Sequence, residues 1–151
     1  MVTKTVVVGI GNEIMGDDGL GIVAVRELKR VLPDSAAYIE AAVGGLQLLE
    51  ILYGYQRAIL VDSIVGENPG RIHQLTADEV FSHPRLSCVH DADFATALAL
   101  ARELKLLIPD EITVFAVEVK DVHTFREGLS PEIKAAIPEL ISRIAALLKE
   151  T

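Results

Sequence analysis

The fold is decided by residues 5–21, TVVVGIGNEIMGDDGLG, in which an apolar run passes directly into a loop of glycines and acidic residues. The run Thr5–Ile10 is nearly continuous, without alternation of apolar and polar residues. The runs Arg57–Val65 and Glu111–Val119 repeat this pattern. Continuous runs rich in β-branched residues are typical of strands that are covered on both faces in a parallel sheet.

Weaker patterns complete the expected sheet and its helices. Residues 36–41 supply another strand, and residues 71–75 follow a turn-forming segment and predict an antiparallel edge strand. Apolar stripes at helical spacing cover residues 20–31, 45–53 and 94–104. A last helix begins with Ser130 as N-cap and Pro131 at its first position, and we expect Pro138 to kink or split it. The sequence therefore predicts one α/β domain over residues 1–151, a three-layer α/β/α sandwich with a mostly parallel sheet of about five strands and helices on both faces.

Composition excludes several classes of function. The chain of 151 residues has a formal net charge of −8, and its basic residues are scattered, which disfavours nucleic-acid binding. No segment approaches the roughly 20 continuous apolar residues of a membrane span, and the N-terminus resembles no secretory signal. The single cysteine, Cys88, excludes an internal disulfide and suits a reducing compartment. We expect a cytoplasmic protein that binds neither nucleic acid nor membrane.

Candidate functional residues follow the strands, where ligands gather in open α/β sheets. Asp18, Asp62 and His90 come from three separate loops that the fold could bring to one end of the sheet. Two carboxylates and one imidazole form a borderline ligand set that accepts zinc, nickel and related ions, with coordination positions left open.

A nucleotide site is rejected, because Ile14 stands where a dinucleotide fingerprint needs its third glycine and adjacent acids would repel a pyrophosphate.

Each of these residues also has an ordinary structural interpretation, and residue spacing alone does not favour the metal site. Asp17 and Asp18 stand where helix N-caps belong. Asp62 could hold a turn after its strand. A lone histidine such as His90 is more often a loop or core residue than a ligand.

Other catalytic arrangements are less well supported. The sequence contains no His-Glu-x-x-His helix and no Gly-x-Ser-x-Gly elbow. Cys88 lies two residues before His90, but a buried inert thiol is the preferred interpretation. The remaining histidines have no acidic or cysteine partner at ligand spacing and are predicted to be surface residues; they are His73, His83 and His123.

Several motifs resemble the hydrogenase maturation endopeptidases over essentially the whole chain. The opening motifs GIGN at residues 9–12 and GDDGLG at residues 16–21 are specific to this resemblance. AILVD at residues 58–62 looks like the family's second acidic motif, and His90 before a helix is similar to its third. GLSP at residues 128–131 fits the family's C-terminal pattern.

The resemblance implies an α/β/α hydrolase, an aspartic-type endopeptidase that removes the C-terminal extension of a [NiFe]-hydrogenase large-subunit precursor after nickel insertion. It places the metal-contacting positions, which are also the catalytic set, at Asp18, Asp62 and His90. We expect the nickel to be supplied by the substrate, with zinc or cadmium as surrogate ions, and a monomeric enzyme. The resemblance does not identify the nucleophile-activating group. Asp17, Glu40 and Glu118 are candidates for a supporting or base role, and the attacking nucleophile stays open.

Three alternatives remain at this point. The first is a conventional metallopeptidase that holds its own ion, which would activate water and polarise the carbonyl. The second is a non-catalytic metal carrier or scaffold in hydrogenase assembly. The third is an unrelated small-molecule hydrolase on the same fold, since a fold does not determine a function.

Overall fold

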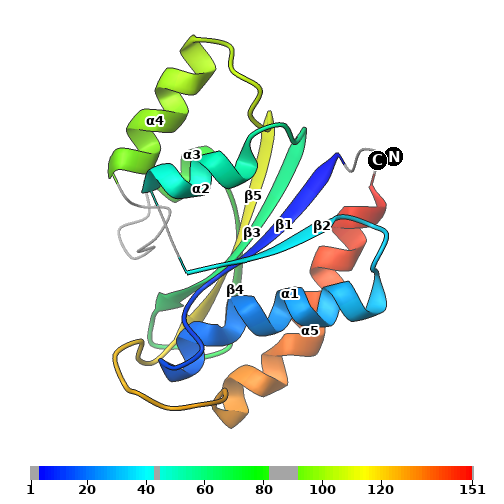
Figure 1. Ribbon diagram of the computed structural model, residues 1–151. Helices are drawn as coiled ribbons and strands as arrows, with labels where there is room; N and C mark the ends of the chain where they lie inside the picture. The colour runs from blue at the N-terminus through cyan, green and yellow to red at the C-terminus, as the bar shows by residue number, and fades with distance from the viewer. Residues whose placement is uncertain (1–3, 43–44, 82–91, 151) are drawn as a thin grey trace.

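A five-stranded sheet forms the centre of the molecule (Figure 1). The computed structural model describes residues 4–42, 45–81 and 92–150. The strand order is β2-β1-β3-β5-β4, and only β4 runs antiparallel to its neighbour. The strands are β1 (Thr5–Ile10), β2 (Ala37–Ala41), β3 (Arg57–Val65), β4 (Ile72–Thr76) and β5 (Glu111–Val119). All five expected strands are confirmed, including the antiparallel edge strand.

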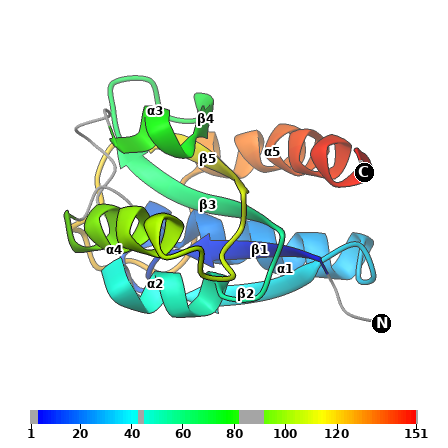
Figure 2. The same ribbon diagram turned by 90° about the horizontal axis from the view of Figure 1, so that it is seen from above.

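Helices cover both faces of the sheet (Figures 1 and 2). One face carries α1 (Leu20–Val31) and α5 (Pro131–Lys149). The other carries α2 (Gly45–Leu52), α3 (Ala77–Phe81) and α4 (Ala92–Glu103). The predicted three-layer α/β/α sandwich is therefore confirmed. α3 and the 3₁₀ turn η1 (Gly16–Gly19) were not predicted, because elements this short give no periodic signal in the sequence.

The core consists of two apolar clusters, one on each face of the sheet. Alternation along β3 sends Leu60 and Ile64 into the cluster beneath α2, α3 and α4, and Ile59 and Val61 into the cluster beneath α1 and α5. The same alternation places the next polar pair of β3 on opposite faces. Asp62 belongs to the α2–α4 face, and Ser63 belongs to the α1–α5 face.

The last helix does not divide at Pro138. α5 runs as one helix from Pro131 to Lys149 with Pro138 inside it, so of the two expected effects of the proline, a kink or a split, the split does not occur. Proline removes one backbone hydrogen bond from a helix interior. Here Ile133 before the proline and Leu140 after it are both fully buried against the sheet, so tertiary packing holds the two halves together. None of the helices in the described ranges is long and apolar enough to cross a membrane.

Candidate active site

Three glycines bring the first loop into direct contact with the sheet. A Cβ atom at Gly9 would lie 2.2 Å from the carbonyl oxygen of Gly21, and one at Gly21 would lie 2.5 Å from the carbonyl oxygen of Val61. α1 therefore begins in backbone contact with β1 and β3. Gly11, at a φ of +156°, would place a Cβ 2.0 Å from the carbonyl oxygen of Asp18. The glycine pattern of the opening motif thus serves close packing that sets Asp18 beside the end of β1.

The carboxylate of Asp18 is fixed by two hydrogen bonds. Ser63 donates from its hydroxyl to Oδ1 at 2.7 Å, and the backbone N–H of Asn12 donates to Oδ2 at 3.1 Å. Asp18 does not cap a helix, since the N-cap of α1 is Gly19. An ionised carboxylate has about four lone-pair positions, so the two bonds leave acceptor capacity on both oxygens. Asp18 is therefore a positioned, half-buried carboxylate that can still bind a cation.

Asp62 lies inside β3, although the sequence analysis expected it in the following loop. β3 continues to Val65 because it pairs with β5 through Val119, whereas its last partner on β1 is Gly9, opposite Val61. Asp62 thus stands at the level where β1 turns away from the sheet. Its side chain is 1% exposed, and its Oδ1 accepts a hydrogen bond from the backbone N–H of Ser63 at 2.8 Å. The alternative role, a turn after the strand, does not apply.

Asp17 connects the first loop to the start of α5. Its two oxygens accept hydrogen bonds from the backbone N–H of Ser130 at 2.6 Å and from the Ser130 hydroxyl at 2.8 Å. The guanidinium of Arg126 lies 3.6 Å from the same carboxylate. Ser130 occupies the predicted N-cap position of α5, but its hydroxyl donates to Asp17 instead of accepting from the helix. Asp17, 7% exposed, is therefore a structural clamp and not a helix cap.

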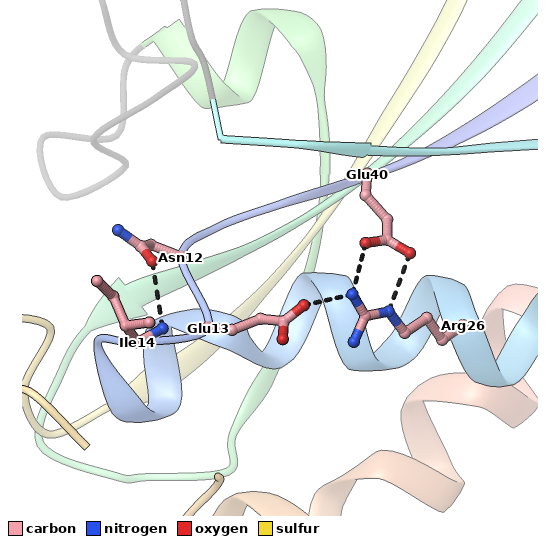
Figure 3. A network of polar contacts seen from close by, with 5 residues as sticks. All are labelled: Asn12, Glu13, Ile14, Arg26 and Glu40. Carbon is pink, nitrogen blue, oxygen red and sulfur yellow. Dashed lines mark hydrogen bonds and ion pairs between the residues drawn. The ribbon is translucent and has the colours of Figure 1, made fainter. Parts of the chain in front are cut away.

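Glu40 is paired with Arg26 at the end of β2 (Figure 3). The guanidinium donates to both Glu40 oxygens, at 2.9 and 2.8 Å, and also lies 2.5 Å from Glu13. These hydrogen bonds from Arg26 hold the pKa of Glu40 below its ordinary value. A carboxylate stabilised in its ionised form is a weak proton acceptor, so Glu40 is a poor candidate for the general base. Beside this network, Asn12 accepts a hydrogen bond from the backbone N–H of Ile14 and shapes the loop (Figure 3).

Glu118 forms the second polar centre at this end of the sheet. It is 6% exposed, and its Oε2 lies 2.9 Å from Nε2 of His73. The backbone N–H of Asn68 donates to Oε1 at 3.3 Å, and Arg71 lies 3.9 Å away. The hydrogen bond to His73 is the main reason that the pKa of Glu118 is lowered. The sequence shows no acidic partner for His73 at ligand spacing because this partner lies 45 residues further along the chain, on β5. His73 was predicted to be a surface residue, and the structure leaves it half-buried.

The third predicted ligand lies outside the described residues. His90 falls in the segment 82–91, as do Cys88 and His83. Within the ranges that the structure describes, no three His, Cys, Asp or Glu side chains gather closely enough to hold a metal ion. The structure thus places two members of the predicted set, and the complete set stays a prediction.

Comparison with known proteins decides the family. A family model for hydrogenase maturation proteases matches residues 22–147, which is most of the chain. The chain belongs to the hydrogenase maturation protease family. The expected resemblance is thereby confirmed, and so is the expected class of enzyme, a maturation endopeptidase.

Individual members of the family are similar over nearly the whole of this chain. The hydrogenase expression/formation protein HupD of Bradyrhizobium diazoefficiens is 28% identical, over 97% of this chain and 79% of its own. The hydrogenase 2 maturation protease of Escherichia coli is 27% identical, over 98% of this chain and 92% of its own. The solved structure of the hydrogenase maturating endopeptidase HybD from E. coli superposes with a TM-score of 0.82 at 25% identity, over 97% of this chain and 93% of its own.

The hydrogen-bond partners of the site residues are the part of the structure that was least predicted from the sequence. Asp18 and Asp62 reach the same end of the sheet, as predicted. Ser63, which connects them, was not singled out, although its place directly after Asp62 was the available signal. The pairing of His73 with Glu118 had no local signal at all, since it depends on the register of β4 against β5.

Proposed function

We propose that this chain removes the C-terminal extension of a [NiFe]-hydrogenase large-subunit precursor and uses nickel already in the precursor as its recognition element. One observation carries the proposal. The hydrogen bond between Ser63 and Asp18 sets one predicted ligand beside the residue that follows the other, Asp62. Membership of the family supports the same reaction, and a structural relative from Thermococcus kodakarensis is titled a [NiFe] hydrogenase maturation protease.

The donor atoms suit an ion that arrives with the substrate. Asp18 and Asp62 offer carboxylate oxygens, and His90 would add an imidazole nitrogen. Such a set binds borderline divalent ions, so nickel fits it, and zinc or cadmium would act as surrogates. Three protein ligands leave coordination positions for groups of the precursor.

The enzyme would recognise the nickel-loaded precursor because it binds this form more tightly than the nickel-free form. A precursor with nickel gains contacts to these side chains that an empty precursor lacks, so the loaded form docks preferentially. Asp18 can take part without reorganisation, because Ser63 and Asn12 already hold its carboxylate in place. The enzyme would act as a cytoplasmic monomer on a protein substrate.

The test compares site variants on a nickel-loaded cognate precursor. Asp18→Asn and Asp62→Asn keep the size of each side chain and remove its charge, and His90→Ala removes the imidazole. Asp34→Asn, in the exposed turn after α1, is the matched control. Mass spectrometry of the large subunit should show the extension lost with wild type and control and retained with the three site variants. Full cleavage by all three would refute the proposed site, and binding without cleavage by wild type would favour a carrier or scaffold.

A further inference from the structure

Asn12 lies between the end of β1 and the carboxylate of Asp18. Its own backbone N–H donates a hydrogen bond to Oδ2 of Asp18 at 3.1 Å. The carbonyl oxygen of Asn12 accepts from the backbone N–H of Met15 at 3.1 Å. The preceding residue, Gly11, donates from its backbone N–H to the carbonyl oxygen of Ala41 at the end of β2, at 3.0 Å. The backbone of Asn12 is therefore held on both sides and is in direct contact with the first predicted ligand.

The side-chain amide of Asn12 has a defined orientation. Its Oδ1 accepts a hydrogen bond from the backbone N–H of Ile14 at 3.2 Å, so its Nδ2 points away from Ile14 (Figure 3). Turning the amide over would place Nδ2 against this N–H and lose the bond, because both groups are donors. Asn12 is exposed, and no residue in the ranges that the structure describes accepts a hydrogen bond from Nδ2. Two N–H donors are thus presented beside Asp18.

The fold itself does not use these donors. The local turn needs only the acceptor Oδ1, which aspartate or serine can also supply. The acidic side chains of the same loop are engaged elsewhere: Glu13 with Arg26, Asp17 with Ser130, and Asp18 with Ser63. The amide donors of Asn12 are therefore available to an acceptor group of the substrate.

We propose that Nδ2 of Asn12 donates to the oxygen of the scissile carbonyl and stabilises the negative charge that this oxygen gains in the transition state. The inference rests on the function proposed above, in which docking of the precursor's nickel at Asp18 brings the scissile bond beside Asn12. A water oxygen adds to the carbonyl carbon, and the π electron pair moves onto the oxygen that Asn12 faces. When the pair re-forms the double bond, the C–N bond breaks and the proton lost by the water ends on the leaving nitrogen. The products are a new C-terminal carboxyl group on the large subunit and a released peptide with a free amine.

This role suits a donor that is fixed before the reaction begins. A preorganised N–H stabilises the developing charge without reorganisation in the transition state. The docked precursor removes water from around the exposed amide, and a hydrogen bond to a charged oxygen is stronger at lower dielectric. The contact is stronger in the transition state than with the neutral carbonyl, so it should raise the rate of cleavage and contribute little to precursor binding.

The experiment measures single-turnover cleavage at saturating nickel-loaded precursor by Asn12→Asp and Asn12→Ser. The first change keeps the size of the side chain and the acceptor for Ile14. The second keeps a neutral acceptor, and its hydroxyl ends one bond short of Nδ2. Asn68→Ser, an exposed change at the other asparagine of the chain, is the matched control and should cleave like wild type. Loss of one oxyanion donor costs about 10²- to 10³-fold in kcat, so both Asn12 variants should lose at least about 100-fold in rate constant. Precursor binding by Asn12→Ser should be unchanged.

The outcomes separate this inference from the proposed function. A wild-type rate constant in Asn12→Ser would overturn the role of the amide donors, and slow cleavage by Asn12→Asp would then reflect repulsion by the added charge. A rate of Asn12→Ser that recovers fully at higher precursor concentration would place Asn12 in docking alone, which also overturns the inference. If Asn12→Ser does not fold, Asn12→Thr, which supplies the same kind of acceptor, decides the question. Failure of wild type to cleave would overturn the proposed function itself.

Discussion

The hydroxyl of Ser63 donates a hydrogen bond to Oδ1 of Asp18 at 2.7 Å and joins parts of the chain that lie 45 residues apart. The bond spans the place where β1 has ended and β3 continues toward the loop, paired only with β5 on its other side. It fixes the first loop against the strand that carries Asp62. The geometry of the candidate site therefore depends on a side chain that is not itself a proposed ligand.

Ser63→Ala should impair the site more than the fold. A neutral intramolecular hydrogen bond contributes about 1 kcal/mol net, and one to a charged acceptor contributes somewhat more, so we expect a loss of about 1–2 kcal/mol in unfolding free energy. Cleavage of nickel-loaded precursor should slow because Asp18 is no longer held. Denaturant unfolding and cleavage rates measured side by side check this. Ser142→Ala, an exposed change on α5, should alter neither quantity.

Asp17→Ala should destabilise the protein by about 2–3 kcal/mol, since it leaves a partly buried backbone N–H and the hydroxyl of Ser130 without their charged acceptor. Urea denaturation measures the change. Asp34→Ala, in an exposed turn, should stay within about 0.5 kcal/mol of wild type. Equal stability of the two variants would show that Asp17 does not clamp η1 to α5.

Gly21→Ala, compared with Gly54→Ala, separates the free-energy cost of a steric clash from the cost of an unfavourable backbone conformation. Its Cβ would lie 2.5 Å from the carbonyl oxygen of Val61, so α1 would have to move away from the sheet. We expect a loss of at least about 3 kcal/mol in unfolding free energy, at the upper end of overpacking costs. The comparison is Gly54→Ala, where φ is +90° and no atom lies within 4 Å of the added methyl. That change should cost only about 1–2 kcal/mol, and a larger loss there than at Gly21 would contradict the close contact of α1 with β3.

Because of Glu118, the unfolding free energy should decrease as the pH falls into the acid range. Its pKa in the folded protein is lowered from an ordinary value of 4.5, mainly by the hydrogen bond with His73. Its contribution is therefore present above about pH 4.5 and is lost as the pH falls through the lower folded value. Unfolding free energies of wild type and Glu118→Gln, measured across acid pH, should converge as the pH falls. A constant difference between them at every pH would refute the linkage.

The sheet could be predicted from the sequence because its signals are local. The continuous apolar runs of β1, β3 and β5 reflect burial on both faces of the sheet, and the turn-forming residues before β4 predict an edge strand. The roles of Asp17 and Asp18 could not be separated in the same way. They are neighbours in one 3₁₀ turn, and only the tertiary fold sends one to Ser130 and the other to Ser63.

The candidate site was predicted only in part for a similar reason. Asp18 and Asp62 could be found because ligands collect at the carboxyl ends of parallel strands. The connection of His73 to Glu118 depends on strand register, since β4 must pair with β5 so that both side chains share a face. Register is set by the whole sheet, and the sequence around His73 does not contain it.

The most direct test of the central claim is cleavage of one cognate precursor with and without inserted nickel. The wild-type protein is incubated with each form, and the mass of the large subunit is followed over time. We predict that the C-terminal peptide is released from the nickel-loaded form alone. Equal release from the nickel-free form would contradict recognition through the substrate's nickel and would favour a metallopeptidase that holds its own ion.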